Sequence, residues 1–166
     1  TVTRLNDDRE VLFFGDLNAN VNSLDARSGE HLWTNDVEKH EGARITGAPV
    51  VYSDQVFVPV SSAEETLALD PEYACCTFRG SLVSLDIVTG ELVWKTYVIS
   101  EQPRPRGRNP DGAFLMGPAG AAIWSAPTVD VERGAVYVGT GNDYTELPSA
   151  TSDAVVAFDL ETGAIR

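Results

Sequence analysis

The sequence predicts an all-β protein made of repeated four-stranded antiparallel sheets, arranged as part of a β-propeller. Three observations support this prediction. A ten-residue pattern recurs along the chain, short strands rich in Val, Tyr, Phe and Thr precede each copy, and no stretch between the copies has helical periodicity. Radial repetition of four-stranded sheets is the architecture of a β-propeller.

The repeated pattern is hydrophobe-Asp-x-x-Ser/Thr-Gly-x-x-x-Trp. It covers residues 24–33 and 85–94, and a third copy begins at Phe158 and reaches Arg166, one residue short of the expected Trp. The Asp side chain opens a tight turn, and Gly takes the position that needs a positive φ. Each copy therefore supplies the last two strands of a sheet and a tryptophan for the core.

Two earlier strands are expected ahead of each copy. Residues 45–51 and 55–60 precede the second copy, and residues 124–130 and 134–140 precede the third. Residues 10–15 are expected to form the second strand of the first unit, whose first strand lies near or before the N-terminus. Each unit thus has the four strands of one propeller blade.

The copies are further apart than the roughly 40–50 residues that one blade needs. The excess predicts two inserts, around residues 64–79 and 100–120, and inserted loops on a repeat scaffold commonly carry function. The chain accounts for about two to three blades, whereas propellers close with about four to eight. We therefore expect residues 1–166 to be a segment of a single propeller domain in a longer protein.

Composition limits the classes of partner. The net charge is −13, from 25 acidic and 12 basic residues. Nucleic-acid binding needs a basic face, so no nucleic-acid partner is expected. No run of about 18 apolar residues occurs, so no membrane span is expected either.

The only two cysteines, Cys75 and Cys76, are neighbours in the sequence. They can form a vicinal disulfide, which makes a stiff apolar plate across one peptide unit. They can also remain free thiols, which pack as small hydrophobic side chains. The pair alone leaves both interpretations open, and a bonded pair would indicate an oxidising compartment.

Longer motifs resemble those of the pyrroloquinoline quinone (PQQ) dependent alcohol dehydrogenases, which are periplasmic eight-bladed propellers. The resemblance extends along almost the whole chain and is strongest to the polyvinyl-alcohol dehydrogenase branch. It rests on the run Glu-Tyr-Ala-Cys-Cys-Thr-Phe-Arg-Gly-Ser at residues 72–81, on Trp-Ser-Ala-Pro-Thr-Val-Asp at 124–130, and on Thr-Ser-Asp-Ala-Val at 151–155.

The resemblance implies a set of PQQ-binding residues. Trp124 would stack on one face of the quinone, and a Cys75–Cys76 disulfide would cover the other face. Arg79 would reach a carboxylate or quinone oxygen, and the hydroxyl of Thr46 would lie near a carboxylate. The alternatives are structural: a core tryptophan, a surface arginine in an ion pair, and an ordinary strand threonine.

The resemblance also implies a Ca²⁺ ion beside PQQ, held by oxygen ligands. Glu64 and Asn142 match the family's Glu and Asn, and both offer the hard oxygens that Ca²⁺ prefers. Glu65 is the rival of Glu64 because the register of the insert is open. Asp143 is the rival of Asn142 because the resemblance also admits this pair in the reverse order. Outside this context, Gly-Thr-Gly-Asn-Asp at residues 139–143 is typical of a plain β-turn.

The implied activity is oxidation of secondary alcohols or polyols such as polyvinyl alcohol, in a periplasmic or secreted enzyme. A small or polymeric alcohol is the expected substrate, and a cytochrome c is a candidate electron acceptor. The family's catalytic base is an Asp on a later blade, and no residue of this chain matches it. The alternatives are a non-catalytic scaffold of the outer-membrane assembly lipoprotein type and a sensor that binds the cofactor without turnover.

Overall fold

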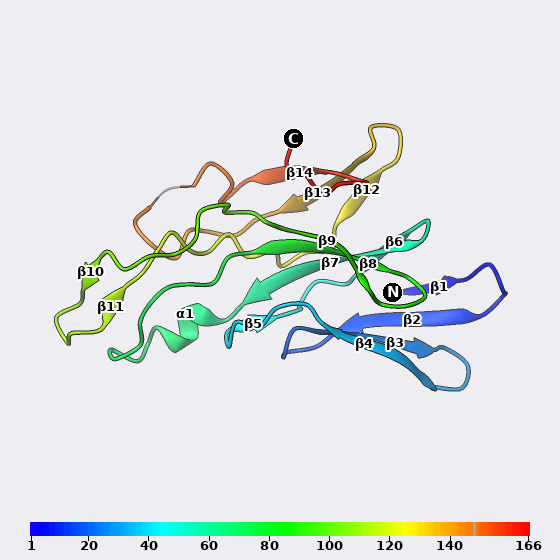
Figure 1. Ribbon diagram of the computed structural model, residues 1–166, viewed down its shortest axis with the longest axis horizontal. Coiled ribbons are helices and arrows are strands. Elements are labelled where there is room, and N and C mark those ends of the chain that lie inside the picture. The colour runs from blue at the N-terminus through cyan, green and yellow to red at the C-terminus, as the bar shows by residue number, and fades with distance from the viewer. Residues whose placement is uncertain (148) are drawn as a thin grey trace.

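The computed structural model describes residues 1–147 and 149–166 and contains three main antiparallel sheets that follow one another along the chain (Figure 1). The first sheet has the order β1-β2-β3-β4. Its strands are β1 (Val2–Arg4), β2 (Glu10–Gly15), β3 (Asn20–Asp25) and β4 (His31–Asp36). The predicted four-stranded unit with its first strand near the N-terminus is therefore present.

The second sheet is built around one long strand whose outer partner is broken in two. Its strands are β5 (Ala43–Arg44), β6 (Val50–Tyr52), β7 (Gln55–Ser62), β8 (Ser81–Asp86) and β9 (Leu92–Tyr97). Strand β6 pairs with the start of β7 and β5 pairs with its end. The predicted strand at residues 45–51 is thus shorter than expected, because the segment that contains Pro49 leaves the ladder.

The third sheet has the order β12-β13-β14, with β12 (Thr128–Asp130), β13 (Ala135–Gly139) and β14 (Val155–Asp159). A single bridge joins Ile165 to Phe158 where the fourth strand of this unit begins. The strand predicted from residue 124 starts only at Thr128. Pro127, which has no N–H to donate, immediately precedes it.

The two predicted inserts carry little regular structure. The first contains the one-turn helix α1 (Glu64–Leu67), and the second contains a two-stranded hairpin of β10 (Gly107–Arg108) and β11 (Phe114–Leu115). Figure 1 shows both inserts, and residues 140–147 after β13, at the end of the sheets opposite the repeated Asp turns. Within the described residues no helix has the length and apolar character needed to cross a membrane.

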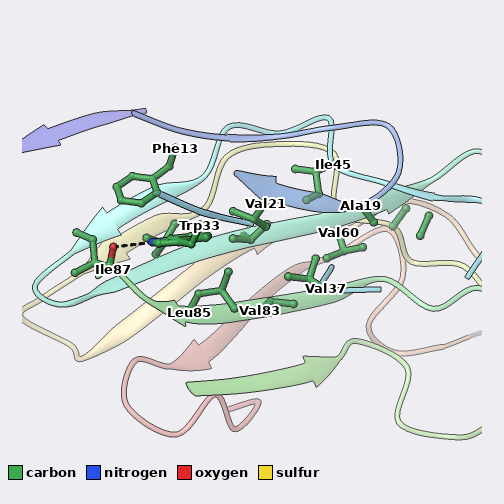
Figure 2. Close-up of a cluster of buried hydrophobic side chains, with 14 of the residues drawn as sticks. Phe13, Ala19, Val21, Trp33, Val37, Ile45, Val60, Val83, Leu85 and Ile87 are labelled. Carbon is green, nitrogen blue, oxygen red and sulfur yellow. Dashed lines mark hydrogen bonds between the residues drawn. The ribbon is translucent and has the colours of Figure 1, made fainter. Parts of the chain in front are cut away.

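The core consists of two layers, one on each face of the second sheet. Alternate residues of β7 point in opposite directions, so Val56, Val58 and Val60 face the first sheet and Phe57 faces the third. Figure 2 shows the first layer, in which Phe13 and Trp33 lie close together and the Trp33 Nε1 donates to the carbonyl of Ile87.

Each repeat tryptophan packs on the turn glycine of the next repeat. A Cβ added at Gly90 would lie 2.5 Å from the Trp33 ring, and one added at Gly163 would lie 2.4 Å from the Trp94 ring. Gly29 occupies the same turn position with the same sign of φ, but nothing lies within 4 Å of its added Cβ. The repeated Gly therefore serves both the turn and the contact between sheets.

This difference gives a prediction with an internal control. Gly29→Ala should lower the free energy of unfolding of the intact protein by about 1 kcal/mol, because alanine is strained at positive φ. Gly90→Ala should cost about 1–3 kcal/mol more, because its methyl group also collides with the buried indole. Chemical denaturation measures both values, and equal losses would contradict the packing role of Gly90.

Candidate functional site

The gap between β5 and β6 exposes Thr46 at the insert end of the second sheet. Its Oγ1 lies 2.9 Å from the Oγ of Ser61, and that serine donates to the carbonyl of Arg44. The backbone next to Thr46 touches the third unit, because a Cβ added at Gly47 would lie 2.8 Å from the carbonyl oxygen of Ser125. Thr46 therefore lies beside the segment that carries Trp124.

Trp124 differs from the other two tryptophans in its burial. It is 43% exposed, whereas Trp33 and Trp94 are each 8% exposed and belong to the two core layers. Its neighbour Ile123 is fully buried and donates its backbone N–H to the carbonyl of Val60, so the backbone beside Trp124 is anchored to the second sheet. A Cβ added at Gly141 would lie 2.7 Å from the Trp124 Nε1, so glycine at that position lets the indole approach the backbone closely.

Asn142 follows Gly141 directly, and its side chain contacts the first insert. Its Nδ2 donates to the Oε1 of Glu65 at 3.1 Å, and both side chains are exposed. Two backbone bonds, from Gly141 to Ala122 and from Ala121 to Asn142, hold this segment against the one that carries Trp124. The exposed indole of Trp124 thus lies against Gly141, and the next residue, Asn142, contacts the carboxylate of Glu65.

Glu64, by contrast, points into the protein and is fully buried. Its carboxylate accepts hydrogen bonds from the backbone N–H groups of Thr77 (2.7 Å) and Phe78 (2.8 Å), and from the hydroxyl of Tyr73 at 3.1 Å. Successive residues on a helix are about 100° apart, which separates Glu64 from Glu65. The structure therefore brings Glu65, and not Glu64, to Asn142.

The environment of Glu64 also shifts its pKa. Burial alone raises the pKa of this carboxyl, but the hydrogen bonds from His40, Thr77 and Phe78 outweigh burial and hold the pKa below its ordinary value. A buried carboxylate with this many donors is a structural anchor for the insert that carries the cysteines.

The lowered pKa of Glu64 predicts a pH dependence. Since the folded-state pKa lies below the unfolded value of about 4.3, the stabilisation is complete above that value and is lost as the pH falls toward the folded pKa. Unfolding free energies of the intact protein and of Glu64→Gln should differ by a constant amount above about pH 5 and converge in more acidic solution. A difference that stays constant down to pH 3 would contradict this assignment.

His40 is a member of this buried cluster that the sequence did not single out. Its Nε2 lies 3.3 Å from the Glu64 Oε1 and 3.0 Å from the Thr77 Oγ1, while its Nδ1 accepts the N–H of Gly42. Accepting at Nδ1 places the proton of the neutral ring on Nε2, where it faces Glu64. The residues of this cluster come from separate segments of the chain, so no local motif signals it.

Cys75 and Cys76 are joined in a disulfide, so the disulfide interpretation of this pair is confirmed. Cys76 is 1% exposed, and only Cys75 lines an open pocket, of about 490 Å³, beside Leu115 and Asp143. Trp124 is not among the residues that line this pocket. That the disulfide covers the face of a quinone opposite Trp124 stays a prediction.

Arg79 lies largely inside the protein and is already engaged there. It is 7% exposed, its Nη1 donates to the carbonyl of Ile99 at 3.0 Å, and its guanidinium stacks 3.9 Å from the centre of the Tyr97 ring. Burial lowers the pKa of Arg79. These contacts join the first insert to the end of β9. They also engage the guanidinium group of Arg79, which the sequence resemblance predicts to contact a ligand.

Asp143, the rival of Asn142, faces away from Glu65. Its Oδ2 accepts the backbone N–H of Ser149 at 2.9 Å and the hydroxyl of Ser152 at 2.8 Å. In the described part of the chain, no three His, Cys, Asp or Glu side chains converge as a metal site would need. Ca²⁺ takes about six to eight oxygen ligands, so Glu65 and Asn142 alone can supply only part of such a site.

The chain is similar to several proteins of one enzyme family. Residues 38–166 match the family model described as PQQ glucose/ethanol/alcohol dehydrogenase, β-propeller domain. Polyvinylalcohol dehydrogenase from Pseudomonas sp. is 44% identical over 94% of this chain, and that from Sphingopyxis sp. strain 113P3 is 42% identical over 95%. The chain spans 24% of the length of each of these two relatives.

Solved structures show the same fold. The quinohemoprotein alcohol dehydrogenase of Comamonas testosteroni superposes with a TM-score of 0.64 at 23% identity, over 95% of this chain and 25% of its own. A europium-containing methanol dehydrogenase gives a TM-score of 0.66 at 24% identity, over 100% of this chain and 31% of its own. The predicted partial propeller of four-stranded blades and the predicted family are confirmed.

Proposed function

Since this chain belongs to the β-propeller domain family of the PQQ-dependent glucose, ethanol and other alcohol dehydrogenases, we propose that it is part of an enzyme that uses PQQ and Ca²⁺ to oxidise secondary alcohols or polyols. The two polyvinylalcohol dehydrogenases favour a substrate of that kind. The observation that carries the proposal is the exposed indole of Trp124 next to the Glu65–Asn142 pair.

These residues fit a planar cofactor with a hard cation at its rim. A tryptophan that is 43% exposed offers a flat aromatic surface on which a planar ring can stack. Glu65 and Asn142 both carry oxygens that suit Ca²⁺, and the carboxylate contributes the negative charge. Thr46 adds a hydroxyl on the side of the second sheet.

The chemistry that bound PQQ would supply is acceptance of a hydride from the carbinol carbon, and Ca²⁺ would supply Lewis acidity toward the quinone. The residues of this chain would bind and orient the cofactor and the cation. Trp124 would fix the plane of the ring, Glu65 and Asn142 would hold the cation, and Thr46 would hydrogen-bond a carboxylate. Arg79 and Glu64 act structurally in this proposal, and the general base lies on another part of the protein.

A location in the periplasm or outside the cell is part of the same proposal. The vicinal disulfide supports it, because disulfides persist in oxidising compartments and are rare in the cytosol. A cytochrome c is the proposed electron acceptor.

The decisive experiment uses the full-length protein that contains this segment. After loading with PQQ and Ca²⁺, it should reduce an artificial dye when given a secondary alcohol, and chelation of the metal should abolish the reaction. Gel filtration of the loaded protein should recover PQQ with the protein peak. Absence of dye reduction together with loss of PQQ would support the scaffold alternative, and retention of PQQ without turnover would support the sensor.

A further inference from the structure

The guanidinium group of Arg44, in β5, has no partner in the described part of the chain. It forms no ion pair with any described carboxylate, although the sequence has 25 acidic residues. Its Nε is buried and makes no hydrogen bond. Its two terminal nitrogens also donate to no described residue, but they are not buried, so a ligand can reach them. A half-buried charge without a counter-ion is costly.

The other arginines show that this arrangement is unusual in this chain. Those that form ion pairs with carboxylates are Arg4, Arg9, Arg27, Arg104, Arg133 and Arg166. Arg79 and Arg108 donate to backbone carbonyls. Arg106 has no such partner among the described residues, but it is exposed, so water solvates its charge. Arg44 is therefore a half-buried arginine whose charge needs a partner from outside the described residues.

Strand pairing places Arg44 on the face of the second sheet that looks toward the third. Arg44 pairs with Ser61 of β7, and residues directly opposite each other in an antiparallel ladder point to the same face. Ser61 lies four positions after Phe57 along β7, and Phe57 faces the third sheet, so Ser61 does as well. The Oγ of Ser61 lies 2.9 Å from the Oγ1 of Thr46. Arg44, Ser61 and Thr46 thus lie on one side of the sheet.

This side of the second sheet meets the segment that carries Trp124. A Cβ added at Gly47 would lie 2.8 Å from the carbonyl oxygen of Ser125, and Ser125 follows Trp124 directly. The same Cβ would lie 2.9 Å from the Cγ of Pro59, which shares the face of Ser61 on β7. Arg44 therefore belongs to the side of the second sheet on which the proposed cofactor surface lies.

The proposed cofactor surface needs a positive side chain. PQQ is a planar quinone that carries carboxylates, and a chain with a net charge of −13 repels an anion. Among the residues assigned to that surface above, the one charged side chain is Glu65, which is negative. A cation held there offsets part of this charge, and a guanidinium would offset more.

We propose that Arg44 binds a carboxylate of the cofactor and supplies the positive charge that this surface requires. The inference rests on the proposed function. An arginine presents its N–H donors as a planar fork, which matches the two oxygens of a carboxylate and makes charge-assisted hydrogen bonds. Arg44 binds and orients the ring in this proposal, and it has no part in the transfer of the proton or the hydride.

The test is a fluorescence titration of the full-length protein with PQQ at saturating Ca²⁺. Arg44→Gln should weaken PQQ binding about tenfold to a hundredfold, as expected for the loss of hydrogen bonds to a charged group. Arg44→Lys keeps the charge without the fork and should recover part of this affinity. Arg27→Gln removes the same charge from an exposed turn at the opposite end of the sheets and is the control. It should change the affinity by less than about twofold, because solvent and salt screen a distant charge.

The salt dependence of binding separates this role from a merely structural one. If Arg44 pairs with a carboxylate of PQQ, added salt should weaken PQQ binding less in Arg44→Gln than in the unmodified protein. If Arg44 only supports the fold, Arg44→Gln should lower the unfolding temperature and leave the salt dependence unchanged. An unchanged salt dependence, or an unchanged PQQ affinity in Arg44→Gln, would overturn this inference and leave the proposed function standing. Absence of PQQ binding by the unmodified protein would overturn both.

Discussion

Trp124→Ala in the full-length protein is expected to weaken PQQ binding about a hundredfold while leaving the fold intact. The variant removes the flat surface on which the quinone rests, and a large aromatic contact is worth about 2–3 kcal/mol. The side chain is already 43% exposed, so its removal leaves little cavity. Quenching of protein fluorescence during PQQ titration measures the affinity, and thermal unfolding measures the fold.

Trp33→Ala is the control for this prediction. That indole is 8% exposed, contacts Phe13 and packs on Gly90, so its loss should lower stability by about 3–5 kcal/mol. Unchanged PQQ affinity in Trp124→Ala would remove the cofactor surface from this part of the chain.

The neighbouring carboxylates of α1 give the second prediction. Of two isosteric substitutions, one should lower the stability of the fold and the other should lower the affinity for Ca²⁺. Glu64→Gln should lower the free energy of unfolding by about 2–4 kcal/mol, because the new amide N–H₂ must face backbone donors at Thr77 or Phe78. Glu65→Gln should change stability by less than about 0.5 kcal/mol, since its side chain is exposed.

Ca²⁺ affinity should show the reverse order. Glu65→Gln removes a charged ligand oxygen and should weaken Ca²⁺ binding in the presence of PQQ on the order of tenfold or more. Glu64→Gln should leave the intrinsic affinity unchanged under conditions in which the variant is folded. Calcium titration at a temperature well below both unfolding transitions measures this, and a larger loss in Glu64→Gln would assign the ligand to Glu64.

The parts of the fold that the sequence predicts well are those determined by local contacts. In each repeat the Asp carboxylate accepts the N–H groups of the residues two and three positions later, as Asp86 does from Val88 and Thr89. The glycine that follows has a φ of +71 to +75° in all three copies. Five residues contain everything that this turn needs, so a pattern search finds it.

The site is less predictable because its contacts join segments that lie far apart in the chain. Whether Glu64 or Glu65 faces Asn142 depends on where a single helical turn begins, which the sequence left open. His40 reaches Glu64 only because the loop after β4 packs against the first insert, and nothing in the local sequence of either residue indicates that. Trp124 could be separated from the repeat tryptophans in advance, because it precedes a strand and lies outside the repeated pattern.

The contact between Trp94 and Gly163 has a consequence at the opposite end of the molecule. It joins the second unit, which carries Thr46 and Glu65, to the third, which carries Trp124 and Asn142. The indole of Trp94 thus sets the angle between the second and third sheets. A bulkier residue at position 163 should push these two sheets apart. The groups proposed to face the cofactor would then change their relative positions without any substitution near them.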